Sequence, residues 1–518
     1  MARRIARREI SARELVAAHI ARIETVDGLL NAVVVRRFEQ AIEEASAADA
    51  AQARGEPLGL LHGVPVTVKE CFHVAGTQAT IGLERLKGNV SKEDGLLVGR
   101  LRRAGAIILG KTNLPQMMIW HECDNPVYGR TNNPWDLSRT PGGSTGGEAA
   151  IIAARGSPLG LGNDMGGSVR VPCHFCGIHG LKPTTFRLPR AGAVPTLRGM
   201  EAIQTQPGPM ARHVEDLALG LKVLDDDADG YVAGTVAPGM IGNFEEVDVR
   251  KLKVALWTDD GVMPASEAIA RAVREAGEIL RSLGATVEGI EPAKVTEQFG
   301  TSEAFDIYCG LLGSDGGADA RRVIGESPLD WRVARLVWLA GLRPLSRFSL
   351  VAGLRSTGQK SMARLLAAAR GRSADGYWQL SHQKNELVAE AFAALKAGGF
   401  DIVICPPHAL PAPQHGKPID LIMAASYAYW PNLLGVPAGV VSTSRVRADE
   451  EGGRPESRDQ VFRQARTVDR GSSGLPVGVQ VVGLPWQEAQ VLAVMHAIEA
   501  ATRGNADFPE RATIPVSV

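Results

Sequence analysis

The chain has 518 residues, of which 45% are hydrophobic, and its 57 basic and 57 acidic side chains give a formal net charge of zero. This balance supplies enough apolar surface for a large core and excludes a general electrostatic attraction to nucleic acid or acidic lipid. Six irregularly spaced cysteines favour reduced thiols over a disulfide framework, so we expect a cytoplasmic enzyme without structural disulfides.

The first predicted element is an amphipathic helix that begins near residue 11. Ser11 and Glu14 have the spacing of a capping box, in which each side chain bonds to the backbone of the other residue. The basic residues before this helix are not followed by a continuous apolar segment, so we do not expect a secretion signal. The sequence also lacks an apolar run long enough to span a bilayer.

Short β-rich runs alternate with helical patterns along the chain, which predicts an α/β layered protein. The clearest helical pattern covers residues 265–284, and the predicted strands cover residues 64–69, 106–111, 252–257, 401–405 and 476–483. No proline- or serine-rich linker and no internal repeat divides the chain. We therefore expect a single domain over residues 1–518.

Three segments differ in composition from the rest. Residues 128–210 are rich in glycine and proline, which predicts loops that cross the functional end of the protein. Residues 321–372 combine many arginines with tryptophan and leucine, and we expect a basic, apolar helical hairpin that forms a cap. Residues 443–473 are polar and charged, as is typical of a surface insertion.

A candidate nucleophile lies in GNDMGGSVRVP, residues 162–172, where Ser168 follows two glycines. Gly166 and Gly167 have no side chain to obstruct a carbonyl oxygen. The backbone N–H groups of Met165, Gly166, Gly167 and Ser168 can therefore converge on one oxyanion. A serine nucleophile also needs a base, and no histidine lies nearby in the sequence.

Two upstream motifs offer that base. In PGGSTGGEAA, residues 141–150, Ser144 is again flanked by glycines, and Lys69 ends the apolar strand in GVPVTVKECF, residues 63–72. Desolvation at the end of a buried strand disfavours the ammonium form and lowers the pKa of a lysine from about 10.4. A neutral lysine amine is a competent base.

Several motifs together resemble the amidase signature family, and most closely its fatty-acid amide hydrolase-like subgroup. The resemblance covers nearly the whole chain and rests on GVPVTVKECF, KTNLPQ, CDNPVYGRTNNPWD, PGGSTGGEAAII, GSPLGLGNDMGGSVRVPCHFCGIHGLKPT, GPMARHVEDLAL, NLLGVPAGVV and GLPVGVQVVGLPWQE. It implies an α/β amidase signature fold, with a large, mixed, twisted β-sheet covered by helices on both faces.

The resemblance also implies a mechanism for the three polar residues. Lys69 takes a proton from Ser144, Ser144 takes one from Ser168, and Ser168 attacks the substrate carbonyl to form an acyl-enzyme. Asp164 and Arg170 flank the nucleophile, and we expect them to support its loop through hydrogen bonds. The bridging serine of the family follows a cis peptide bond, so the bond before Ser144 is expected to be cis.

The segment after KTNLPQ is expected to line the substrate pocket. Met118 and Ile119 lie where the relatives have apolar channel residues, and His121 lies where they have an aromatic residue. Residues 331–350 correspond roughly to the membrane-facing cap of the relatives, and arginines beside tryptophans, such as Arg332 and Arg335, suit an interfacial helix. A peripheral membrane contact, a buried lid and a homodimer contact all stay open for this segment.

The predicted function is hydrolysis of hydrophobic acyl or aryl amides, with a small-molecule substrate, no cofactor and no nucleic-acid partner. Carbamate (urethanase) or ester hydrolysis at the same site, and the amidase subunit of a tRNA-dependent amidotransferase, stay open as alternatives. A metal site is not expected, because CHFC, residues 173–176, lacks a second ligand pair at zinc-binding spacing. GGSTG, residues 142–146, matches the nucleophile elbow of α/β-hydrolases, but a proline-broken loop precedes it instead of a strand.

Overall fold

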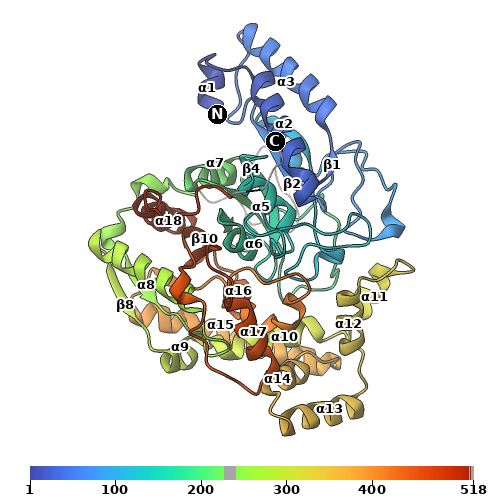
Figure 1. The fold of residues 1–518 in the computed structure, drawn as a ribbon, viewed down its shortest axis with the longest axis vertical. Coiled ribbons are helices and arrows are strands. Elements are labelled where there is room, and N and C mark those ends of the chain that lie inside the picture. The colour runs from blue at the N-terminus through green and yellow to red at the C-terminus, as the bar shows by residue number, and fades with distance from the viewer. Residues whose placement is uncertain (227–240, 513, 515–518) are drawn as a thin grey trace.

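The computed structural model describes residues 1–226, 241–512 and 514. A mixed sheet of eleven strands forms its centre, in the order β1-β3-β2-β4-β6-β5-β10-β11-β9-β7-β8 (Figure 1). The strands are β1 Val33–Arg36, β2 Pro65–Lys69, β3 Ile107–Thr112, β4 Leu159–Asp164, β5 His179–Lys182, β6 Gln206–Ala211, β7 Lys253–Leu256, β8 Thr286–Gly289, β9 Ile402–Cys405, β10 Ala438–Arg445 and β11 Pro476–Gly483. The mixed α/β sheet confirms the predicted fold class.

Helices cover the sheet and extend beyond it at both ends. The α-helices are α1 Ala2–Ala6, α2 Ala12–Leu30, α3 Phe38–Ala53, α4 Leu96–Arg103, α5 Gly146–Ala153, α6 Arg170–Cys176, α7 Val214–Leu224, α8 Glu267–Ser282, α9 Pro292–Phe299, α10 Thr301–Gly313, α11 Ala318–Ile324, α12 Trp331–Ala340, α13 Pro344–Ser356, α14 Lys360–Ala368, α15 Ala374–Gly398, α16 Ser426–Leu434, α17 Gln460–Asp469 and α18 Glu488–Thr502. The 3₁₀ turns are Glu84–Leu86, Gln116–Met118, Phe244–Glu246, Val249–Lys251, Pro418–Asp420, Ile422–Ala425 and Ala448–Glu450.

Local sequence signals place the ends of several elements correctly. The Ser11 side chain accepts from the Glu14 N–H at 3.0 Å, and Glu14 accepts from the Ser11 N–H at 2.9 Å, so the predicted capping box starts α2. The five predicted strands correspond to β2, β3, β7, β9 and β11, and the predicted helix at 265–284 is α8. All six cysteines are buried free thiols.

Both faces of the sheet are buried, and β7 shows how alternate side chains divide between them. Val254 and Leu256 belong to a core cluster that includes residues of α7, α8 and α18. The intervening Ala255 belongs to a second cluster that includes residues of α10, α15 and α16. This two-residue period, with apolar partners on each side, is the pattern of a strand covered by helices on both faces.

The strands β2 and β4 are parallel neighbours, with Thr67 opposite Gly160 and Val68 opposite Leu161. Their carboxyl ends therefore lie at the same edge of the sheet, which brings the end of β2 close to the end of β4. A Cβ atom on Gly160 would overlap the Glu148 side chain of α5, so this position needs glycine. The direct contact between helix and strand fixes α5 against β4.

The glycine-rich segment 128–210 is more regular than the predicted loops, because α5, β4, α6, β5 and β6 all form within it. The expectation of mainly irregular backbone was wrong for a physical reason. In β4 the glycines accommodate close packing against α5, whereas the usual strand signal is an alternation of large apolar residues.

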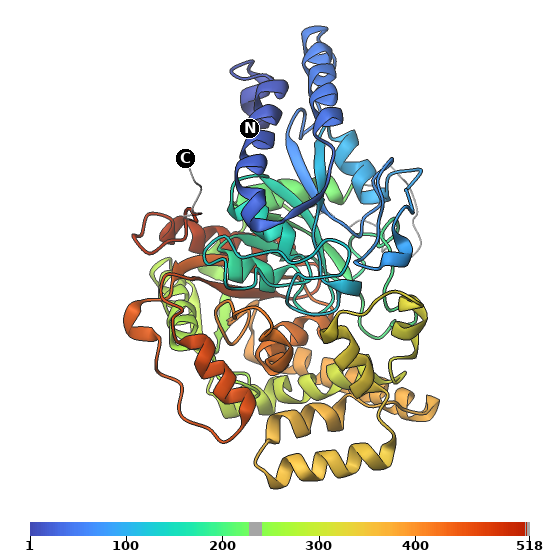
Figure 2. The same ribbon diagram turned by 45° about the vertical axis from the view of Figure 1, so that its right-hand side comes forward.

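Helices α11 to α14 form the segment that we expected to be a helical hairpin at 321–372. They lie at the opposite end of the molecule from α2 and α3 (Figures 1 and 2). The polar segment 443–473 contains the end of β10, one 3₁₀ turn and α17, and α17 buries Val461, Ala465 and Val468. Among the described residues, no helix combines the length and apolar character needed to cross a membrane.

Candidate active site

The side chain of Lys69 reaches three oxygen acceptors at the carboxyl ends of β2 and β4. Its Nζ lies 2.6 Å from Ser144 Oγ, 2.7 Å from Asn163 Oδ1 and 3.1 Å from Thr145 Oγ1. The lysine is completely buried. Burial lowers the pKa of Lys69 to about 8, although nearby acidic groups, including Asp164 and Glu148, partly oppose the shift. A substantial fraction of the amine is therefore neutral near neutral pH.

The two serines are held together by the backbone. The N–H of Thr145 donates to the carbonyl oxygen of Ser168 at 3.1 Å, which joins the segment before α5 to the segment before α6. The peptide bond between Gly143 and Ser144 is cis, as the family resemblance implied. Ser144 is buried, whereas Ser168 is only half-buried. Ser168 is thus the serine that a substrate can reach.

A buried ion pair closes the loop that carries Ser168. The Asp164 carboxylate accepts from Arg170 Nη2 at 2.9 Å and Nε at 3.0 Å, and both side chains are fully buried. Asp164 also accepts from the backbone N–H groups of Gly167 at 2.8 Å and Val169 at 3.2 Å. Burial acts to raise the pKa of Asp164, but the Arg170 charge and these hydrogen bonds outweigh it and hold that pKa below its ordinary value.

The outer side of this ion pair is also hydrogen-bonded. Arg170 Nη1 donates to Gln480 Oε1 at 2.6 Å, and Arg170 Nη2 donates to the Ala428 carbonyl oxygen at 3.1 Å and to Asn432 Oδ1. Every polar atom of a buried charge that is paired in this way lowers the cost of desolvation. The loop geometry around Ser168 is therefore fixed from β11 and α16 as well as from β4.

Three backbone N–H groups beside Ser168 are free to receive an oxyanion. Among the described residues, the N–H groups of Met165, Gly166 and Ser168 find no acceptor, whereas that of Gly167 already donates to Asp164. The structure thus differs from the predicted set of four donors at Gly167. That residue has a φ of 98°, which favours glycine, and a Cβ atom there would overlap Ala428.

Two side chains hold the carbonyl groups of the same loop. The Tyr308 hydroxyl donates to the Met165 carbonyl oxygen at 3.4 Å, and His121 Nε2 lies 3.0 Å from the Gly166 carbonyl oxygen. Burial lowers the pKa of His121 to about 4, so the ring is neutral and its proton is on Nε2 in this hydrogen bond. Because the N–H and C=O of a trans peptide point in opposite directions, these contacts orient the Gly166 N–H.

The predicted pocket residues divide between this site and the core. Met118 Sδ lies 3.7 Å from Asn163 Nδ2, so Met118 is beside the lysine cluster, and His121 contacts the serine loop. Ile119 is half-buried and packs against the main core cluster. Met117, Met118 and Trp120 all have positive φ values, so the backbone of this segment is unusual for residues other than glycine.

Sequence reasoning missed several contributors. Asn163 could have been found from its place at the end of β4, had the glycine-rich strand been recognised. Tyr308, Gln480 and Asn432 come from distant elements, and no local signal links them to Ser168. Glu148 lies in the recognised motif, where it accepts from the Thr112 hydroxyl at 2.7 Å and from the Thr67 hydroxyl. Burial raises the pKa of Glu148 to about 8.

The cysteine-rich helix α6 shows no arrangement of ligands for a metal. His174 accepts from the Gly478 N–H at 3.0 Å and lies 3.2 Å from the Leu410 carbonyl oxygen. In the part of the chain that the structure describes, no group of three or more His, Cys, Asp or Glu side chains could hold a metal ion.

Comparisons with known proteins agree with the geometry. A family model described as Amidase matches residues 14–492. Fatty-acid amide hydrolase 1 of Sus scrofa is 37% identical over 462 residues, which cover 86% of this chain and 76% of that protein. A glutamyl-tRNA(Gln) amidotransferase subunit of Anaeromyxobacter dehalogenans is 31% identical over 507 residues, with coverages of 96% and 94%.

Solved structures with the same fold cover nearly the whole chain. A fatty acid amide hydrolase gives a TM-score of 0.81 at 23% identity, covering 98% of this chain and 84% of that one. A 6-aminohexanoate cyclic dimer hydrolase gives 0.75 at 23% identity, with coverages of 99% and 97%. The chain belongs to the amidase signature family, and it is a hydrolase that acts on carbon–nitrogen bonds.

Proposed function

We propose that this protein hydrolyses hydrophobic acyl or aryl amides through a Lys69–Ser144–Ser168 relay. The observation that supports this proposal most directly is the 2.6 Å hydrogen bond between Lys69 Nζ and Ser144 Oγ, made by a fully buried lysine. A buried amine with a pKa near 8 is a base at neutral pH, and Ser144 is the hydroxyl that it contacts.

The relay delivers protons in both directions. Ser168 Oγ attacks the acyl carbon while its proton passes to Ser144 Oγ, and the Ser144 proton passes to neutral Lys69. When the C–N bond breaks, Ser144 gives a proton to the leaving nitrogen and recovers one from Lys69, leaving an acyl ester on Ser168. Water then attacks this ester by the same path and releases the carboxylic acid. Protonation matters because an amine anion is a poor leaving group.

The negative charge that develops on the acyl oxygen needs donors that are already oriented. We assign this role to the N–H groups of Met165, Gly166 and Ser168, and we assign Gly167 to positioning because its N–H is engaged by Asp164. Asp164 and Arg170 hold the loop and do not exchange protons in this scheme. Met118 and His121 line the acyl side of the site, and Ile119 supports Met118 from the core.

The test compares kcat/KM for anilides, esters and carbamates of matched acyl length, from acetyl to long chain, with Ser168→Ala as the blank. A steep rise with chain length that disappears in Ser168→Ala is the expected result for hydrophobic amides. Preference for carbamates or esters would keep the relay but replace the substrate class. Full activity in Ser168→Ala would overturn the relay itself.

An amidase subunit of a tRNA-dependent amidotransferase is a second candidate, because a relative of that description aligns over nearly the full length of both chains. The same experiment separates the two functions. Turnover of free hydrophobic amides by the isolated chain supports the hydrolase. Turnover of glutamine alone, with no activity on any hydrophobic amide, supports the amidotransferase.

The cap around residues 331–350 supports a hydrophobic substrate. Trp331, Trp338, Leu345 and Phe348 are all more than half exposed on α12 and α13. We propose that they contact a membrane surface near the substrate entrance. Loss of vesicle co-sedimentation in Trp338→Ser/Phe348→Ser, with short-chain activity retained, is the expected result. Unchanged vesicle binding would rule this contact out, and a monomer-to-dimer change instead would make the same face a homodimer interface.

Arg332 and Arg335 do not serve as interfacial cations in the way that the sequence suggested. Arg332 is buried and pairs with Asp124 at 2.7 Å, and Arg335 pairs with Asp420 at 2.8 Å. These pairs attach α12 to the body of the protein. The vesicle experiment therefore changes the apolar residues of the cap and not these arginines.

A further inference from the structure

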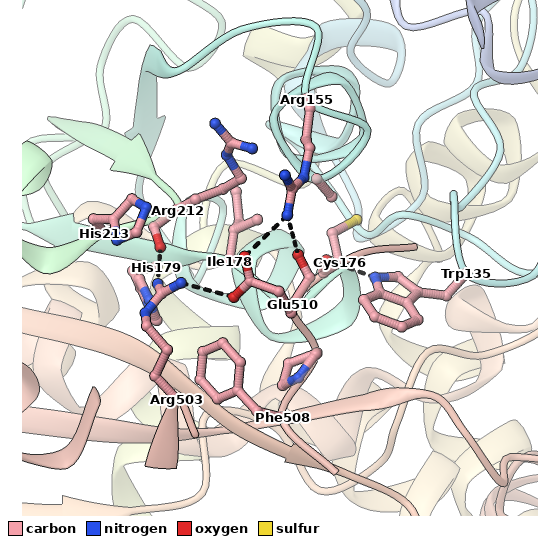
Figure 3. Close-up of a pocket in the computed structure, with 13 residues that line it drawn as sticks. Trp135, Arg155, Cys176, Ile178, His179, Arg212, His213, Arg503, Phe508 and Glu510 are labelled. Atoms are coloured by element: carbon pink, nitrogen blue, oxygen red, sulfur yellow. Dashed lines mark hydrogen bonds and ion pairs between the residues drawn. The ribbon is translucent and has the colours of Figure 1, made fainter. Parts of the chain in front are cut away.

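A separate cavity of about 120 Å³ lies at the far ends of the two helices that begin beside the serines (Figure 3). Its lining includes Ala153 and Arg155 at the end of α5, and Cys176 and Gly177 at the end of α6. A helix of eight residues is about 12 Å long, so this cavity is distinct from the site at the start of α5.

Three arginines from different elements converge on this cavity. Arg155 follows α5, Arg212 follows β6 and Arg503 follows α18. Figure 3 shows Arg155 and Arg503 reaching the carboxylate of Glu510 from different sides. Arg155 Nη2 lies 2.9 Å from Glu510 Oε1, and Arg503 Nη1 lies 2.8 Å from Glu510 Oε2. One carboxylate of the same chain thus bridges two of the three guanidinium groups.

The guanidinium of Arg212 makes no hydrogen bond or ion pair with any described residue, and no dashed line reaches it in Figure 3. Its Nε is buried without a partner, as is the Nε of Arg155. Burial, together with the nearby charge of Arg155, lowers the pKa of Arg212. Buried guanidinium N–H groups without acceptors are costly, and an oxyanion is the ligand that satisfies them best.

The charge count in the cavity also favours an anion. The three guanidinium groups face two carboxylates, Glu510 and Glu499, and Glu499 is shared by Arg503 at 2.5 Å and by two histidines. His213, one of those histidines, is half-exposed at the edge of the cavity. A group that supplies two negative charges would offset the excess positive charge.

We propose that this cavity binds a small inorganic oxyanion with the size and charge of phosphate, held by Arg155 and Arg212, with Glu510 competing for Arg155. The cavity has room for about four water molecules at about 30 Å³ each, which suits a tetrahedral oxyanion and excludes a nucleotide. This site is independent of the amide hydrolysis proposed above, so either proposal can fail alone.

The test is a titration of the full chain with inorganic phosphate at constant ionic strength, followed by calorimetry and by thermal unfolding. Saturable binding that raises the Tm by about 2–4 °C is expected for the wild type. Arg212→Gln is expected to weaken phosphate binding at least about tenfold, since it removes the guanidinium that has no other partner. Arg250→Gln, at an exposed arginine paired with Asp248, is the matched control and is expected to bind like wild type.

A second variant keeps the test decisive if Arg212→Gln folds poorly. Glu510→Gln retains all three arginines and removes the competing carboxylate, so it is expected to bind phosphate at least about threefold more tightly than wild type. The proposal is overturned if phosphate does not bind saturably, or if Arg212→Gln responds as Arg250→Gln does. It is also overturned if Glu510→Gln binds phosphate no more tightly than the wild type.

Discussion

Asn163 Oδ1 accepts a hydrogen bond from Lys69 Nζ at 2.7 Å, so the lysine is held between a neutral amide of β4 and the hydroxyl of Ser144. A carboxylate at this position would stabilise the ammonium form and keep the lysine protonated. The neutral amide orients the amine without adding charge. The base strength of the site therefore depends on burial and on the absence of a charge at residue 163.

The rate of amide hydrolysis is expected to rise with pH through the pKa of Lys69. That pKa is lowered to about 8 by burial, and only the neutral amine above this value can accept the Ser144 proton. We expect kcat/KM for an anilide to increase about tenfold per pH unit below pH 8 and to level off above it. A bell centred near pH 6.5 would instead implicate a histidine.

Lys69→Ala is expected to reduce amide hydrolysis far more than hydrolysis of an activated ester with the same acyl group. The amide needs proton delivery to the leaving nitrogen, whereas a phenolate leaves without it. The measurement is the ratio of the two kcat/KM values in mutant and wild type. Equal losses on both substrates would contradict the relay.

Asn163→Asp is expected to move the pH profile upward. A carboxylate within hydrogen-bond distance of Lys69 favours its charged form, and such a charge shifts a pKa by about 1–3 units. Activity at pH 7 should fall at least about tenfold and recover partly above pH 9. Asn243→Asp, at an exposed asparagine, is the control for adding one negative charge. An unchanged inflection near pH 8 would show that residue 163 does not set the base strength.

Tyr308→Phe is expected to lower kcat about threefold to tenfold with little change in KM, since the lost hydrogen bond orients the loop that receives the oxyanion. The ring stays in place because it stacks on Tyr429 with a centroid distance of 3.9 Å. The matched variant is Tyr427→Phe, whose hydroxyl donates to the Met263 carbonyl oxygen at 2.8 Å, away from the serine loop. That variant should lose stability but not kcat, and the same kcat loss in both would point to a general packing effect.

Asp164→Asn is expected to lower the free energy of unfolding by about 3 kcal/mol at pH 7, because it leaves the buried Arg170 charge without its carboxylate. The pKa of Asp164 in the folded protein lies below its ordinary value of 3.8, so its stabilising contribution is present above that pH and is lost as the pH falls further. Urea unfolding of both proteins at pH 7 and pH 3 measures this difference. Arg274→Gln, which breaks an exposed pair with Glu267, should cost less than about 1 kcal/mol.

Sequence patterns were sufficient for the elements and residues whose signals are local. The capping box of α2, the apolar strand that ends at Lys69 and the glycines around both serines could all be recognised before the structure. The strand β4 was missed because its glycines accommodate α5, and with it the place of Asn163 beside Lys69. Tyr308 reaches the serine loop from more than a hundred residues away, and the buried pairing of Arg332 depends on acidic residues in another segment. Such relationships arise only from tertiary packing.

Lys69 and Asn163 project from adjacent parallel strands, whereas the exposed apolar cap is built from α12 and α13 at the periphery (Figure 2). The parts that handle protons and the parts that meet hydrophobic compounds are thus mechanically separate. A designer could exchange the peripheral helices to admit new compounds while the rigid sheet preserves the bond-breaking chemistry. Such modularity gives one scaffold access to many substrates without rebuilding its reactive centre.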